Sequence, residues 1–383
     1  MTENRTKSGF FERIAEGYFY GSGNEHYLSH RFDEELTKQQ LKSVRSVKLQ
    51  ALSLSAIAGM LGVILLYLPP HWFPEFFTLW TFPLNLWGST FEIPLFSTLY
   101  GLVLAVAEIY FLVFINIRAV HRLAIVCGFP PKEDPEYDMH IRSLVNIGVE
   151  KNAKNELSIG LNPWQGYKRY HLILLFVWNK VKASLSNILF KMIIRRVLGR
   201  YALRIWVDLA GIPVMAIWNA IAANNVFEHA KVRILAPSVI QYSLLYLQNK
   251  HKDEASFRHL SYDILQFLAI KKRSFHENHY LLSINLLRTF NIDPKQEHEL
   301  GDDFYEKIKG LHPEVKEDIA RLLLIGIIID GSLSFQEKRS IRDMQEHGIF
   351  PYSMEEVKLC MQEFVSGKGI GMLKNKLGMQ FVS

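Results

Sequence analysis

Two long apolar runs constrain this chain more than any other feature of its sequence. They cover residues 49–69 and 97–117, and no lysine or arginine occurs between Leu49 and Ile117. Each run has about the 20 residues that a helix needs to cross the hydrocarbon core of a bilayer. The sequence therefore predicts a two-helix transmembrane hairpin. A buried helical hairpin in a soluble protein is the alternative.

The charges around the hairpin predict its orientation. Cytoplasmic loops carry an excess of lysine and arginine, and tryptophan favours the membrane–water interface. The connector 70–96 has no basic residue other than histidine and is rich in Trp, Phe and Pro. We therefore expect an inner-membrane protein with the connector outside and both termini in the cytoplasm. The flanking basic residues are Lys38, Lys42, Arg45, Lys48, Arg118 and Arg122.

Glu108 lies near the middle of the second run, where an ionisable side chain is costly and is a functional hypothesis by default. It could carry a proton or an ion, or bind a partner helix. The structural alternative is a protonated carboxyl bonded to a neighbouring hydroxyl, such as Ser53 or Ser55. Small residues at four-residue spacing would also let helices approach closely. These pairs are Ser55 with Gly59, Ala58 with Gly62, and Gly101 with Ala105.

A basic, aromatic stretch follows the hairpin, and no Asp or Glu occurs between Leu157 and Val207. Within it, residues 187–206 place apolar and basic side chains on separate helical stripes. A basic amphipathic helix beside membrane spans indicates binding to an anionic leaflet. A solvated charged face is the alternative, and no nucleic-acid-binding module is recognisable. The lipid-surface candidates are Lys168, Arg169, Lys191, Arg195, Arg196, Arg200 and Arg204.

A third apolar stretch covers residues 205–234, but Asp208 and Pro213 interrupt it. A third span would place the C-terminal part outside, so we expect a buried or half-inserted helical hairpin here. The segment resembles the EcsC family of bacteria, in which a Gly/Pro turn leads into a helix carrying Asn and then Ala. The matching positions are Gly211, Pro213, Asn219 and Ala230.

The C-terminal part reads as successive helices from about residue 252. One corner, DGSLSFQE, looks like the end of a calcium loop, with Asp330 at position five, Gly331 at six and Glu337 at twelve. Positions one and three would then be Gly326 and Ile328, which supply no side-chain oxygen. Ser334 and Glu337 also match an S-x-x-E capping box. We therefore expect a helix corner rather than a metal site, and a mild effect of Glu337→Gln.

This corner resembles TerB-like domains of tellurite-resistance and related stress proteins. The resemblance rests on an apolar helix that ends in Asp330 and Gly331, followed by a helix that starts at Ser334 and Glu337. It implies a compact helical module, often attached to membrane or multi-domain proteins. It implies no catalytic residue.

Motifs for an enzyme are weak. His259 with Asp263, and His276 with His279, have helical spacing that could share a metal, which leaves a metal-dependent hydrolase as a third possibility. No H-E-x-x-H, P-loop, G-x-S-x-G or dinucleotide fingerprint occurs. We therefore expect no metal, cofactor or catalytic residue.

The predicted organisation is all-α, a transmembrane hairpin with cytoplasmic helical domains. A cytoplasmic segment (1–48) precedes the hairpin (49–118), a basic membrane-surface region (119–250) and a TerB-like domain with its tail (251–383). We expect a non-enzymatic scaffold or regulatory subunit of a bacterial inner membrane, with a protein partner or a second copy of itself. The alternative is a transport or ion-conducting subunit that uses Glu108.

Overall fold

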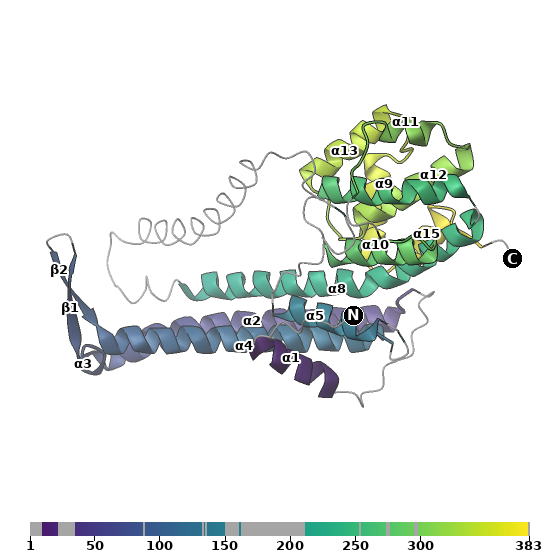
Figure 1. Ribbon diagram of the computed structural model, residues 1–383. Coiled ribbons are helices and arrows are strands. Elements are labelled where there is room, and N and C mark those ends of the chain that lie inside the picture. The colour runs from purple at the N-terminus through teal and green to yellow at the C-terminus, as the bar shows by residue number, and fades with distance from the viewer. Residues whose placement is uncertain are drawn as a thin grey trace. The chain divides into compact units, whose positions relative to one another are not determined.

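The chain is almost entirely helical in the part that the computed structural model describes, which confirms the all-α prediction (Figure 1). The described residues are 10–21, 35–86, 89–131, 134, 136–149, 161, 211–252, 254–272, 276–294 and 298–381. Contacts between residues divide the chain into two compact units. We call residues 46–119 and 167–227 the hairpin unit, and residues 1–45, 120–166 and 228–383 the helical unit.

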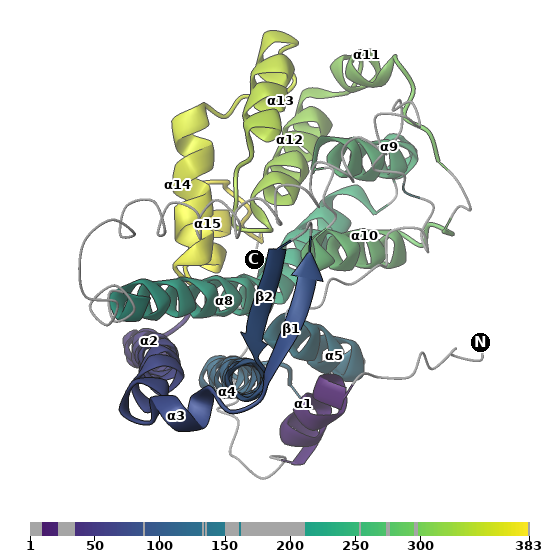
Figure 2. The ribbon, with the colours of Figure 1, turned by 90° about the vertical axis from the view of Figure 1, so that its left-hand side faces the viewer.

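Two antiparallel helices, α2 (Lys38–Trp72) and α4 (Leu95–Cys127), lie side by side, and their residues 46–72 and 95–119 belong to the hairpin unit (Figures 1 and 2). Both are long and apolar enough to cross a membrane. Each contains one predicted run and extends beyond it. They are joined where the Tyr100 hydroxyl donates to the Leu65 carbonyl at 2.7 Å. A Cβ added at Gly101 would lie 3.5 Å from Leu66, which is an ordinary contact distance.

The connector contains the only two β-strands among the described residues. After the short helix α3 (Pro74–Phe77), strands β1 (Thr81–Leu86) and β2 (Ser89–Pro94) pair antiparallel, with Thr81 opposite Pro94. Only an aromatic loop was expected here. Phe76, Phe77 and Phe96 pack edge to face at the base of this ribbon.

Helix α8 (Gly211–His251) is continuous over its whole length. The expected helical hairpin in 205–234 is therefore wrong for residues 211–234, which form a single helix. Pro213 does not break it because proline is tolerated in the first turn, where the backbone N–H groups have no intrahelical acceptor. Residues 211–227 belong to the hairpin unit, and the rest of α8 belongs to the helical unit.

The helical unit begins with α1 (Phe10–Gly21) and α5 (Tyr137–Gly148), which contact each other. The Tyr20 hydroxyl donates to Asp138 at 2.9 Å across that contact. Seven further helices follow α8. They are α9 (Ala255–Lys272), α10 (Glu277–Thr289), α11 (Phe304–Lys309), α12 (Pro313–Ile328), α13 (Phe335–Glu346), α14 (Met354–Val365) and α15 (Gly369–Asn375).

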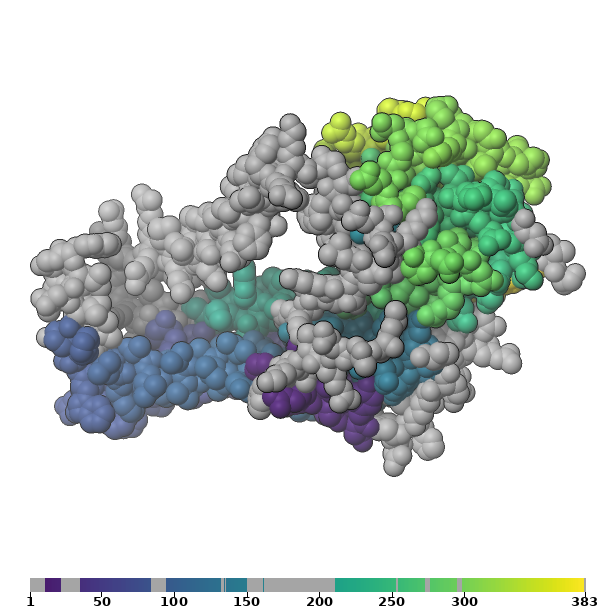
Figure 3. All heavy atoms as spheres, viewed as in Figure 1, coloured from purple at the N-terminus to yellow at the C-terminus, as the bar shows by residue number. Residues whose placement is uncertain are grey.

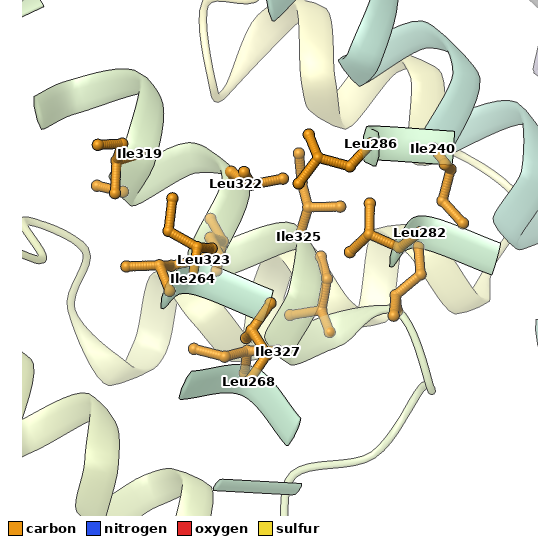
Figure 4. Packing of buried hydrophobic residues seen from close by; sticks show 14 of the residues in the cluster. Ile240, Ile264, Leu268, Leu282, Leu286, Ile319, Leu322, Leu323, Ile325 and Ile327 are labelled. Carbon is orange, nitrogen blue, oxygen red and sulfur yellow. The ribbon is translucent and has the colours of Figure 1, made fainter. Parts of the chain in front are cut away.

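Helix α12 is the centre of the helical unit. Its sequence is apolar on every side in the second half, as expected of a helix surrounded by others. Ile319, Leu323 and Ile325 are completely buried, and Figure 4 shows them among side chains of α8, α9 and α10. Gly326 allows α9 to approach, because a Cβ there would collide with Leu268. This core fixes the ends of α9 and α12, where the turn around Asp330 begins.

Candidate functional site

The intramembrane candidate Glu108 meets a polar partner from α8. The Asn219 amide donates to Glu108 Oε1 at 2.8 Å, within the hairpin unit. Asn219 is buried. The expected hydroxyl partners were the wrong ones, because Ser53 is exposed and Ser55 Oγ, although buried, makes no hydrogen bond in the described part of the chain. The hydrogen bond of the carboxyl therefore joins α4 to α8 and not to α2.

Two glycines of α2 make room for this pair. A Cβ at Gly59 would lie 2.6 Å from the Met215 carbonyl oxygen and 2.8 Å from Asn219 Nδ2. A Cβ at Gly62 would lie 3.0 Å from Glu108 Oε2. Glycine at these positions thus lets α4 and α8 approach α2 closely, as small residues do in membrane helix pairs. The resulting site is a three-helix contact with a carboxamide–carboxyl pair at its centre.

The corner DGSLSFQE forms a capped helix start. Ser334 Oγ accepts from the Glu337 backbone N–H at 3.3 Å, and Glu337 Oε2 accepts from the Ser334 N–H at 2.7 Å. These reciprocal bonds make a capping box at the start of α13. Gly331 has φ of +72°, a conformation that glycine adopts without a steric cost.

A lysine from α9 occupies the centre of this corner. Lys272 Nζ lies 2.8 Å from Asp330 Oδ2, 3.5 Å from the Ser332 carbonyl oxygen, and in contact with Glu337 Oε1. In an EF-hand the side chain at position five, the carbonyl at seven and the carboxylate at twelve bind calcium. The same three positions here bind an ammonium group. The corner is therefore a cation-centred turn whose cation is part of the chain.

At this turn, burial and nearby positive charge shift the pKa of Asp330 in opposite directions. Burial alone raises the pKa of Asp330, but the Lys272 ammonium, with a smaller contribution from His279, outweighs it and holds that pKa below its ordinary value. Lys272 and Glu337 are themselves buried. Buried charges are tolerated when paired and hydrogen-bonded, which both carboxylates are.

The histidine candidates are used structurally. His276 caps α10, because its Nδ1 accepts from the Asn278 N–H at 3.1 Å. His279 Nε2 bonds the Gly326 carbonyl at 2.8 Å. Asp263 lies 2.7 Å from His298 rather than being paired with His259. Within the described residues no group of three His, Cys, Asp or Glu side chains is placed to hold a metal.

A buried network surrounds Arg233, and no sequence pattern predicts it. Its Nε donates to Ser143 Oγ at 2.7 Å, and its Nη2 lies 2.8 Å from His140 Nδ1. The Ser143 hydroxyl contacts Glu277, and His140 Nε2 lies 3.4 Å from Asp134. Burial lowers the pKa of Arg233 and raises that of Glu277. The network ties α5, α8 and α10 together, and only the fold reveals it.

A second buried set surrounds Asp318 on α12. Its Oδ2 lies 2.8 Å from His251 Nε2 and 2.9 Å from Lys250 Nζ, and its Oδ1 contacts Arg321. Burial opposes ionisation, but these donors hold the pKa of Asp318 below its ordinary value. The carboxylate therefore fastens the end of α8 to α12 within the helical unit.

The predicted lipid-surface residues lie outside the described residues, so their arrangement stays a prediction. They are Lys168, Arg169, Lys191, Arg195, Arg196, Arg200 and Arg204.

Comparison with known proteins adds no further constraint. The chain matches no family model, no curated protein and no solved structure.

Proposed function

We propose that this chain is a membrane-anchored scaffold or regulatory subunit that presents its helical unit at the cytoplasmic face of a bacterial inner membrane. The exposed apolar surface of the hairpin unit carries the proposal. On α4, Leu99, Leu102 and Val103 are each about 60% exposed, and α2 exposes Leu61 and Leu65. Figure 3 shows α4, in blue, along the visible face of this unit.

Such a surface fits lipid better than water. Proteins that stay monomeric in water rarely expose contiguous apolar patches larger than a few hundred square ångströms. Side chains of this kind follow one another along α4 from its first turn to Phe114. The exposed large apolar residues of α4 are Leu95, Leu99, Leu102, Val103, Val106, Ile109, Tyr110, Phe111 and Phe114.

The proposed orientation has both termini in the cytoplasm. Lys48 and Arg118 lie at the same end of the antiparallel pair, which favours that end as the cytoplasmic one. Cysteines introduced singly at Ser89 and Ser366, with the two native cysteines replaced by alanine, test it. An impermeant maleimide added to intact cells should label the Ser89→Cys variant and not the Ser366→Cys variant. The reverse pattern would refute the orientation.

A partner-binding role can be tested on the surface of the helical unit. Phe335, at the start of α13, is 75% exposed, and Leu359 on α14 is 45% exposed. Photo-crosslinking amino acids at these positions should give one defined adduct in cells. The same probe at Arg339, an exposed polar position of α13, is the matched control. Equal, diffuse labelling at all three positions would remove the support for a partner.

The basic residues between Lys168 and Arg204 are proposed to lie on the anionic leaflet. Each basic residue near such a surface contributes about 1 kcal/mol of binding free energy. A peptide of residues 187–206 should therefore pellet with phosphatidylglycerol vesicles and be released by salt. Replacing Arg196, Arg200 and Arg204 by glutamine should weaken binding. Equal binding to phosphatidylcholine vesicles would rule out the electrostatic contribution.

The alternative function is transport or ion conduction, and the Glu108–Asn219 pair favours it. A carboxyl held by a single amide within a bilayer could exchange a proton with a pathway. The purified full chain in liposomes should then carry a proton current that Glu108→Gln abolishes. A current absent from both forms, together with a crosslinked partner, would select the scaffold.

A further inference from the structure

The first part of α8 carries large apolar side chains on its outward face. Ile217 is 60% exposed, Trp218 is 55% exposed and Ile221 is 51% exposed. The inward face holds the small or polar residues Asn219 and Ala223, both buried. A helix that packs on a protein in water has its large apolar side chains inside and its polar side chains outside. The arrangement here is the reverse.

The contacts of this segment place it beside the middle of the hairpin. Asn219 and the Met215 carbonyl lie against Gly59, and a Cβ at Gly211 would lie 3.8 Å from Val63. Gly59 is halfway along the apolar run 49–69, so with a rise of about 1.5 Å per residue it lies about 15 Å from either end. The Asn219 amide is therefore at the centre of the proposed hydrocarbon layer.

The order of the contacts also gives the direction of α8. Position 211 lies beside Val63 and positions 215–219 lie beside Gly59, so this segment is antiparallel to α2 and parallel to α4. From Asn219 the helix rises about 12 Å to Phe227. That distance brings Phe227 close to the membrane boundary at which the apolar run of α2 begins.

We propose that residues 211–227 form a third membrane-embedded helix that runs from just beyond the centre of the bilayer to its cytoplasmic boundary. Ile217, Trp218 and Ile221 contact lipid acyl chains and continue the apolar surface of the hairpin. Asn219 faces inward and is bonded to Glu108, so neither polar group is exposed to hydrocarbon. This inference rests on the proposed anchoring of the hairpin, and it gives the chain more than two helices in the membrane.

The energetics favour this position. Moving three large apolar side chains from water to acyl chains is favourable in proportion to the apolar area removed from water. An asparagine alone in hydrocarbon would be costly, but its amide donates to a carboxyl here. A covering protein helix is the competing occupant, and the experiment separates it from lipid.

The test measures the surroundings of single side chains in the full chain. In a variant with Cys127→Ala and Cys360→Ala, a nitroxide is attached at Ile221→Cys, and the protein is placed in nanodiscs of phosphatidylethanolamine and phosphatidylglycerol. Collision rates with oxygen, which concentrates in lipid, and with a water-soluble nickel chelate are then measured. Leu102→Cys on α4 is the lipid reference, and Leu245→Cys on the same helix α8, 45% exposed, is the aqueous reference.

Position 221 should match position 102, with frequent oxygen collisions and few nickel collisions. A match with position 245 would overturn the inference, because the face would then be in water. Protection from both reagents would also overturn it, because protein would then cover the face. Nickel access at position 102 itself would instead refute the anchoring of the hairpin, so the two failures are distinguishable.

Discussion

The Lys272 ammonium lies 2.8 Å from the Asp330 carboxylate and also contacts Glu337, in a turn that presents its oxygens as a calcium loop does. The turn therefore needs a positive charge, and α9 supplies it. Because the lysine is part of the chain, the turn does not need to recruit a cation from solution. Helix α9 and the start of α13 are thus held together by an electrostatic contact as well as by packing.

Removing this charge should unfold the helical unit more easily. Lys272→Met keeps the aliphatic stem but leaves two buried carboxylates without their counter-charge. Breaking a buried pair from one side costs about 3–5 kcal/mol, so we expect a large fall in melting temperature of the full chain in detergent. Lys307→Met is the control, because that lysine is 44% exposed and pairs on the surface. Equal melting of the two variants would contradict the role of Lys272.

Two capping boxes provide a matched pair of substitutions: Ser334 with Glu337 at the start of α13, and Ser353 with Glu356 at the start of α14. Glu337→Gln and Glu356→Gln both keep the bond to the N-cap backbone, but only Glu337 is buried against Lys272. We expect Glu337→Gln to cost about 2–4 kcal/mol, because the pair loses one charge while Asp330 remains. Glu356→Gln should cost less than about 0.5 kcal/mol. This replaces the mild effect that the capping box alone predicts for Glu337.

Thermal melting of both variants in detergent measures the difference. A ligand that binds only the folded state raises the melting temperature. We expect no calcium to bind at this turn, so calcium should leave the wild-type melting temperature unchanged. A rise with calcium that Glu337→Gln abolishes would show that the turn binds a metal ion after all.

Stability should fall on acidification through one buried histidine in particular. Burial, reinforced by Lys272, lowers the pKa of His279 to about 4, whereas an unfolded histidine titrates near 6.5. Between these values the unfolded chain binds the proton and the folded chain does not. The contribution of His279 to the free energy of unfolding is therefore complete above pH 6.5. It falls by about 3 kcal/mol as the pH is lowered toward 4.

A variant isolates this contribution. His279→Gln does not titrate, and its amide can still donate to the Gly326 carbonyl that His279 contacts. The variant should lose less stability between pH 6.5 and 4 than the wild type does, as measured by melting temperature. Identical pH profiles would show that His279 is not a source of the dependence. His276, with a pKa lowered to about 3 chiefly by burial, should account for part of the remainder.

The sequence predicts features formed by residues a few positions apart, and it does not predict contacts between residues far apart in the chain. The S-x-x-E pairs at Ser334 and Ser353 span one helical turn, so their pattern is visible in the letters. Glu108 and Asn219 are 111 positions apart, and no periodicity in either segment signals their bond. Lys272 likewise lies on a different helix from its partners. The sequence does not predict strands β1 and β2, because the aromatic and proline content of residues 70–96 is typical of a loop.

The Glu108–Asn219 bond should show measurable coupling. Asn219→Leu leaves the carboxyl without its donor, Glu108→Leu leaves the amide without its acceptor, and the double variant leaves neither. The double variant should therefore be more stable than the sum of the single changes implies. Hydrogen bonds between membrane helices give about 0.5–2 kcal/mol in such cycles. Melting of all four forms in nanodiscs measures the coupling, and a value of zero would mean that the bond does not form.

The packing of α8 on α2 should be sensitive to a single methyl group at Gly59. A Cβ there would lie 2.6 Å from the Met215 carbonyl, and a backbone atom cannot move aside as a flexible side chain can. Gly59→Ala should therefore push α8 away and lower the stability by about 1–3 kcal/mol. Gly101→Ala is the control in the same unit, because its Cβ would meet Leu66 at an ordinary 3.5 Å. Gly101→Ala should leave the stability unchanged or raise it slightly, since alanine has a higher helix propensity than glycine. Nanodisc melting curves that shift equally for the two variants would show that α8 does not pack on Gly59.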